Sequence, residues 1–192
     1  MKTIRARPFN YRRSIAIASL VLLAALSRHV NASAAVISGT TSSTVLWLSV
    51  PSVAPAAGSY TMVNHDKTFL PPLLVVPVGS TVRFPNEDPF YHSIYSDSPL
   101  DPFDIGYYDT GPGKVVRFAK AAIVNVHCHI HVYMHATIVV VDGPFARTDD
   151  GRYRLQGVPS GTYELHAWDA LHGERTQSVR IPSADAQLTI NL

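Results

Sequence analysis

Apolar and polar residues alternate with a period of two along much of the chain after residue 34. The runs with this pattern are rich in β-branched residues: TVLWLSV (44–50), LLVVPVGSTVRF (73–84), KVVRFAK (114–120), AIVNVHC (122–128) and ATIVVVD (136–142). Such runs predict short strands. Glycine, proline and aspartate separate them at intervals of roughly 8–12 residues, the spacing typical of β-sandwiches. No window has a convincing helical period, so the chain is predicted to be all-β.

The predicted strands fall into two units. The first covers residues 55–143, and the second covers residues 144–192, where the alternating runs RYRLQGV and TYELHAW are separated by a Pro-Ser-Gly turn. Residues 35–54 form an N-terminal strand and linker, because PSVAPAAG follows the strand-like run. This strand has no evident partner and the C-terminal unit is small for a sandwich. We therefore expect residues 36–50 to pair with strands of 145–192, with the first unit inserted between them.

Residues 1–34 predict a signal peptide for export. They hold six Lys and Arg residues, no acid, and the apolar stretch SIAIASLVLLAALS, which is too short to span a bilayer comfortably. Small residues at 32–34 suit cleavage near Ala34, and the pair Arg12-Arg13 hints at a twin-arginine signal. We expect the mature protein in the periplasm, with secretion as the alternative and no stable membrane insertion after cleavage.

Removal of the signal reverses the charge of the chain. Lys plus Arg falls from 16 to 10 (16 − 6) while Asp plus Glu stays at 14, so the formal net charge moves from +2 to −4. The remaining cations are scattered from Lys67 to Arg180 and form no basic patch, which argues against a nucleic-acid partner. A single cysteine in an exported chain closes no internal disulfide, so it is inert, paired with another molecule, or a ligand.

The surroundings of that cysteine favour the ligand. In VNVHCHIHVYMHATIVVVD, Cys128, His131 and Met134 follow the spacing CxxHxxM, between two strand-like runs that place all three on one short loop. His92 is the best candidate for a fourth donor, because it ends the proline-rich turn FPNEDPFYHS and opens another strand. A thiolate, two imidazoles and a weak thioether are the donors of a trigonal copper site with a long axial methionine.

These residues resemble those of the cupredoxins, the small blue-copper proteins such as plastocyanin, pseudoazurin and amicyanin. The CxxHxxM loop is similar to the short ligand loop of amicyanin. LLVVPVGSTVRFPNEDPFYHSIYS is similar to the approach to the first ligand histidine, with Asn86, Asp88 and His92 in register. The resemblance covers roughly residues 60–142. It is nearest to periplasmic plastocyanin-like proteins often labelled as methylamine utilisation proteins, since TDDGRYRLQGVPSGTYELHAW is similar to their carboxypeptidase-regulatory-like segment, an immunoglobulin-like sandwich.

The resemblance implies a fold, a cofactor and a function. It implies a cupredoxin Greek-key β-sandwich, followed by the small immunoglobulin-like unit. One copper ion, cycling between Cu(I) and Cu(II), would be held by His92, Cys128, His131 and Met134. The protein would then carry single electrons rather than act as an enzyme. Its redox partner would dock near His131, which has Ile130, Val132 and Tyr133 around it.

Two features depart from the family pattern. Many cupredoxins carry asparagine after the first ligand histidine, where it links the two ligand loops, whereas this chain has Ser93. His127 and His129 flank the cysteine, and His135 follows Met134. Strand alternation turns the flanking imidazoles to the face opposite the thiolate, where they are either exposed side chains, ligands of a second metal, or groups with a proton-coupled role.

Other functions stay open at this point. The same donors suit a copper carrier or sequestering protein, which holds the metal for delivery rather than for redox cycling. A copper oxidase or a nitrosocyanin-like catalytic site is less favoured and needs an open coordination position. The last alternative is a purely structural adhesion module, which failure to bind Cu(II) stoichiometrically would favour.

Overall fold

The structure is a computed structural model that describes residues 34–50, 52–53, 55–148 and 150–190. The predicted signal peptide, 1–34, therefore lies almost wholly outside the described residues. All regular secondary-structure elements in the described ranges are strands, so the prediction of an all-β chain is confirmed. In these ranges, no helix of the length and apolarity needed to cross a membrane is found.

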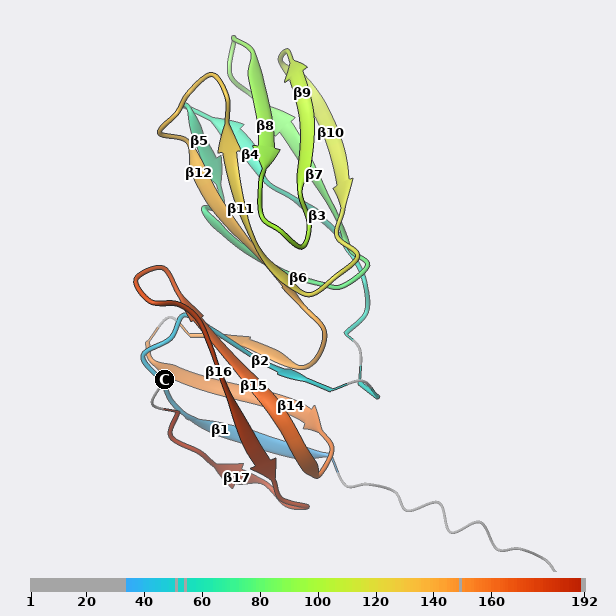
Figure 1. The fold of residues 1–192 in the computed structure, drawn as a ribbon, viewed down its shortest axis with the longest axis vertical. Helices are drawn as coiled ribbons and strands as arrows, with labels where there is room; N and C mark the ends of the chain where they lie inside the picture. The colour runs from blue at the N-terminus through green and yellow to red at the C-terminus, as the bar shows by residue number, and fades with distance from the viewer. Residues whose placement is uncertain (1–33, 51, 54, 149, 191–192) are drawn as a thin grey trace, which may run out of the picture. The chain divides into compact units, whose positions relative to one another are not determined.

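Two five-stranded sheets form the first β unit (Figure 1). One sheet has the order β10-β7-β4-β5, with β3 also paired to β7, and the other has the order β6-β12-β11-β8-β9. The strands of the first sheet are β3 (Ser59–Thr61), β4 (Val63–His65), β5 (Thr68–Leu70), β7 (Thr81–Asn86) and β10 (Gly111–Arg117). Those of the second are β6 (Leu73–Pro77), β8 (His92–Ser96), β9 (Phe103–Tyr108), β11 (Ala122–Cys128) and β12 (His135–Val141).

The alternation in β11 decides which side chains enter the core of this unit. Val124, Val126 and Cys128 are buried, whereas Asn125 between them is exposed. Because successive side chains of a strand point to opposite faces, the cysteine belongs to the inner face. It joins a core cluster whose largest members include Met62, Phe69, Phe84, Ile94, Phe118 and Ile138. The thiol is thus placed by the same period that buries the valines.

The second β unit combines the N-terminal strands with the end of the chain (Figure 1). A three-stranded sheet has β1 (Ala35–Thr40) antiparallel to β14 (Arg152–Val158) and parallel to β17 (Ala186–Gln187). A four-stranded sheet has the order β13-β2-β15-β16, with β2 (Val45–Ser49), β13 (Phe145–Arg147), β15 (Gly161–Asp169) and β16 (Gly173–Ile181). Ile37, Leu46, Leu48, Tyr153, Leu155 and Leu165 are among the residues of its core.

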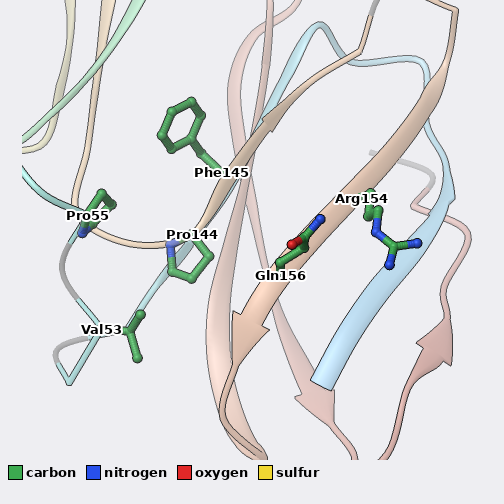
Figure 2. A pocket seen from close by; sticks show the side chains of 6 residues that line it. All are labelled: Val53, Pro55, Pro144, Phe145, Arg154 and Gln156. Atoms are coloured by element: carbon green, nitrogen blue, oxygen red, sulfur yellow. The ribbon is translucent and has the colours of Figure 1, made fainter. Parts of the chain in front are cut away.

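A surface pocket of about 390 Å³ lies at the connections of this second unit, and Figure 2 shows the side chains that line it. Its walls come from the linker before the first unit, from the segment that follows Gly143, and from β14. The lining residues are Val53, Pro55, Pro144, Phe145, Arg154 and Gln156. Neither cysteine nor histidine lines it, so this pocket offers none of the soft or imidazole donors that the sequence singles out.

The turn between β15 and β16 depends on one carboxylate. The Asp169 carboxylate accepts hydrogen bonds at 2.9 Å from the amides of Leu171 and His172, from Nδ1 of His172 and from Nη2 of Arg175. Burial raises the pKa of Asp169, but the hydrogen bonds from the His172 and Leu171 amides and the His172 ring outweigh it, and the pKa is lowered.

We expect Asp169→Ala to lower the free energy of unfolding by about 2 kcal/mol at neutral pH, because hydrogen bonds to a charged group are lost. The folded pKa lies below the unfolded value of about 3.9. The contribution is therefore present above about pH 4 and is lost as the pH falls through the folded pKa. Urea unfolding of both proteins between pH 3 and pH 7 measures this; an equal loss from the exposed Asp97→Ala would contradict it.

Candidate metal centre

The strand pairing places Cys128 beside the first residues of β8. Cys128 is the last residue of β11 and lies opposite Ile94 in the antiparallel ladder. The amide of His129 donates a hydrogen bond of 2.9 Å to the carbonyl oxygen of Ser93. Backbone hydrogen bonding thereby joins the segment next to Cys128 to the segment next to His92, although the two are far apart in the sequence.

Three donor atoms converge at this junction. The Sγ atom of Cys128 lies 3.7 Å from Nδ1 of His92 and 3.8 Å from Nδ1 of His131. The metal-binding atoms of the three residues lie within 4.8 Å of one another, and within the described ranges no other such group of His, Cys, Asp and Glu residues is found. With roughly 2.0 Å to an imidazole nitrogen and 2.3 Å to a thiolate, donors around one ion at a trigonal angle are about 3.8 Å apart. The observed separations therefore suit one shared ion.

Met134 closes the loop that carries His131. Its amide donates a hydrogen bond of 2.9 Å to the carbonyl oxygen of His131, which makes the segment after Cys128 a tight turn. The Met134 side chain is 2% exposed and belongs to the same core cluster as Cys128. All four residues predicted as ligands thus lie at one end of the first β unit, three of them with converging donor atoms and the fourth buried in the adjacent core.

A buried carboxylate holds the ring of His92. His92 is 0% exposed, and its Nε2 atom lies 2.9 Å from Oδ2 of Asp88, which is itself 3% exposed. Since Nε2–H donates to this carboxylate, the lone pair is left on Nδ1, the atom that faces Cys128. A ligand histidine oriented in this way by a second group is common at metal sites. The tautomer needed for binding is therefore set before any ion arrives.

The same carboxylate clamps the turn between β4 and β5. The amide of Asp66 donates to Oδ1 of Asp88 at 2.7 Å, and the amide of Lys67 donates to Oδ2 at 3.0 Å. Both turn residues have positive φ, 49° for Asp66 and 53° for Lys67, which is unfavourable for residues other than glycine. Asp88 compensates by accepting both amides. One side chain therefore ties a strained turn to a candidate ligand.

The ionisation of Asp88 follows from these contacts. Burial alone raises the pKa of Asp88, but the hydrogen bonds from the Lys67 amide, the His92 ring and the Asp66 amide together lower it below its usual range. The carboxylate is consequently negative at neutral pH. This buried negative charge contacts His92, one of the three clustered donors, and therefore stabilises positive charge at the donor cluster.

Asn86 shapes the loop that leads to His92. It is buried, and its Oδ1 atom accepts the amide of Asp88 at 3.0 Å while its Nδ2 atom donates to the carbonyl oxygen of Phe90 at 2.8 Å. Asn86 and Asp88 match the cupredoxin-like pattern in the sequence, but the sequence assigned them no role. Only their nearness to His92 in NEDPFYH pointed to one, and the hydrogen bonds show that both residues position the segment that carries His92.

His131 lies on the more exposed side of the centre. Its ring centroid is 4.9 Å from that of His92 and 5.4 Å from that of Phe90, and Nζ of Lys67 lies 5.3 Å from the centroid of Phe90. Burial lowers the pKa of His131, and electrostatic interactions with His92 and Lys67 lower it further, against an opposing contribution from Asp88. A neutral ring keeps its lone pair, so these surroundings favour a ligand over a proton acceptor.

Ser93 stands at the position where many cupredoxins carry asparagine. Its Oγ atom is buried and has no hydrogen-bond partner among the described residues, so the side chain links nothing. The link between the two ligand segments is instead the backbone hydrogen bond from His129 to Ser93. The substitution therefore leaves the two segments joined.

The donor types decide which metal suits the centre. A thiolate favours soft ions such as Cu(I), imidazoles suit Cu(II) as well, and carboxylate ligands, which calcium and magnesium require, do not converge here. The fold and the site together define a class: an all-β sandwich with a Cys-His-His centre for a soft or borderline metal ion, and a buried methionine next to it.

Several known structures are similar to part of the chain. The copper-containing nitrite reductase from Thermus scotoductus SA-01 is 29% identical, over 47% of this chain and 23% of its own, with a TM-score of 0.42. A reduced amicyanin variant is 20% identical, over 50% of this chain and 98% of its own, with a TM-score of 0.41. A purple cupredoxin from Nitrosopumilus maritimus is 21% identical, over 43% and 99%, with a TM-score of 0.39.

Two of these three structures are cupredoxins, the family that the sequence resembles. The match spans less than a quarter of the nitrite reductase chain. No family model matches the chain, and no curated protein sequence matches it.

Proposed function

We propose that the protein is an exported electron carrier of the cupredoxin type, which binds one copper ion through His92, Cys128, His131 and Met134. The convergence of three donor atoms within 4.8 Å in a pre-built strand junction carries this proposal. Bound copper supplies a one-electron couple, Cu(I)/Cu(II). The protein contributes donors that accommodate both oxidation states, because thiolate and thioether favour the reduced ion while imidazole accepts either.

Rigidity is the main contribution of the chain. Cys128 is fixed at the end of a paired strand, His92 is held by Asp88, and His131 lies in a turn closed by the Met134 amide. Donors held in one arrangement move little when the charge of the ion changes, and small rearrangement favours fast electron exchange. Among the four donors, His131 is the least buried, so we assign it the exit toward a partner.

An apolar rim surrounds that exit. Val132 is 85% exposed, and Ile130 and Tyr133 are exposed as well. Apolar side chains that a protein leaves in water often mark an interaction site. We propose that a redox protein docks here. The periplasm is the proposed compartment because residues 1–34 have the composition of an export signal.

The proposal is tested with the mature protein, beginning at residue 35, loaded with Cu(II). We expect one tightly bound copper, an intense thiolate-to-copper absorption, and a reversible one-electron wave in voltammetry without loss of metal. Copper that leaves on reduction would instead favour the carrier function. A water that exchanges at the bound ion, detected by magnetic resonance, would favour a catalytic site.

A further inference from the structure

A row of polar side chains crosses the outer face of the sheet β6-β12-β11-β8-β9. His127 on β11 lies directly opposite His135 on β12 and opposite Tyr95 on β8, and Tyr95 lies opposite Asp104 on β9. Directly paired residues of antiparallel strands share a face of the sheet. Since Cys128 points to the inner face, this row lies on the other side and uses none of the interior donors.

His129 adds a third imidazole to the same face. It follows His127 by two residues, and its amide continues the ladder by donating to Ser93 at 2.9 Å. The His129 ring stacks on Tyr95 with a centroid distance of 3.9 Å and an interplanar angle of 11°. Tyr95 also lies 5.5 Å from His127, measured between ring centroids. His129 therefore lies on the β8 and β9 side of β11, whereas His135 lies on the β12 side.

The hydrogen bond of the His135 ring leaves a lone pair for a metal. Nδ1 of His135 lies 2.9 Å from the carbonyl oxygen of Tyr133, so Nδ1–H is the donor and Nε2 keeps its lone pair. Nε2 of His129 lies 3.2 Å from Oδ2 of Asp104 on β9, so this ring is engaged on the other side of β11. Histidines that bind metals commonly donate their other ring N–H in this way, to a carbonyl or a carboxylate.

We propose that His127 and His135 chelate a second divalent transition-metal ion, of the Cu²⁺ or Zn²⁺ type. Directly opposed residues have Cβ atoms about 4.5–5.5 Å apart, which lets two imidazoles reach one ion at roughly 2.0 Å. Two imidazoles with water in the remaining positions suit zinc or copper rather than calcium or magnesium.

The test compares the copper-loaded mature protein with its His127→Ala/His135→Ala variant, both titrated with Zn²⁺ and assayed by equilibrium dialysis. We expect the unsubstituted protein to bind one Zn²⁺ equivalent more than the variant. The single variant His135→Ala should bind that equivalent about tenfold more weakly. His172→Ala, which removes an exposed histidine of the second unit, serves as the matched control and should leave the stoichiometry unchanged.

The thiolate-to-copper absorption reports on the interior centre and on folding in every variant. An unchanged band together with the loss of one Zn²⁺ equivalent supports the outer site. Equal Zn²⁺ binding by the unsubstituted protein and the double variant would overturn it. Because the prediction is a difference between two proteins, it is tested even if the interior centre binds no copper. Failure of the proposed function and failure of this inference are therefore separate outcomes.

Discussion

Cys128→Ser is expected to abolish the intense thiolate-to-copper absorption of the copper-loaded protein. A serine hydroxyl is neither soft nor ionised at neutral pH, so the variant lacks the anionic sulfur that faces both Nδ1 atoms, at 3.7 and 3.8 Å. Copper affinity should fall by several orders of magnitude, since a charged ligand is lost. Optical titration with Cu(II), followed by dialysis against a chelator, measures both effects.

The matched control for this variant is His129→Ala. His129 is the next residue in the chain, but its ring lies against Tyr95 rather than at the donor cluster. This control should keep the band at nearly full intensity. Survival of the colour in Cys128→Ser, or its loss in both variants, would contradict the assignment of the thiolate as a ligand.

Asp88→Asn is expected to raise the reduction potential of the centre. The buried carboxylate accepts the ring N–H of His92 at 2.9 Å, and its negative charge stabilises the oxidised ion, which carries one more positive charge, more than the reduced ion. A hydrogen bond to a charged group contributes about 1.5–3 kcal/mol. At about 59 mV for each tenfold change in a one-electron couple, the potential should rise by roughly 60–130 mV. Voltammetry of the copper-loaded variant measures this shift.

Asp104→Asn is the control. It distinguishes the effect on the potential of losing a charge beside a predicted ligand from the effect of losing a charge beside any other histidine. Asp104 also binds a histidine ring, at 3.2 Å, but that ring belongs to His129 on the outer face. Its substitution should move the potential by much less. A second readout is amide hydrogen exchange of Asp66 and Lys67 in the metal-free proteins, which should accelerate in Asp88→Asn because one of the two acceptors of these amides is lost. A potential unchanged in Asp88→Asn would remove the role given to this carboxylate.

The strands were predictable because their signal is local. In β11 the period of two decides which side chains are buried, and that pattern is legible in AIVNVHC without any knowledge of the partner strands. The closeness of the three predicted ligands on one loop was predictable for the same reason. Cys128, His131 and Met134 occupy a single tight turn, so their spacing in the chain already limits their separation in space.

The role of Asp88 could not be predicted from its neighbours in the sequence. The residue was aligned with a family pattern, yet its role depends on three partners: Asp66 and Lys67 in the β4–β5 turn, and His92 at the start of β8. The pairing of His127 with His135 is similar, because the sequence turns the first to the outer face but does not say which residue of the next strand lies opposite. Register is a property of two strands together.

The amino-acid sequence by itself determined that this chain is all-β and that a thiol, an imidazole and a thioether share one loop, because periodicity and short spacing act over a few residues. Only the tertiary structure decided that His92 faces that loop from 36 positions away, that a buried carboxylate orients it, and which strands of residues 145–192 pair with β1, namely β14 and β17. Long-range pairing depends on which complete set of strands buries the most apolar surface and satisfies the most backbone groups. No short stretch of sequence contains that information.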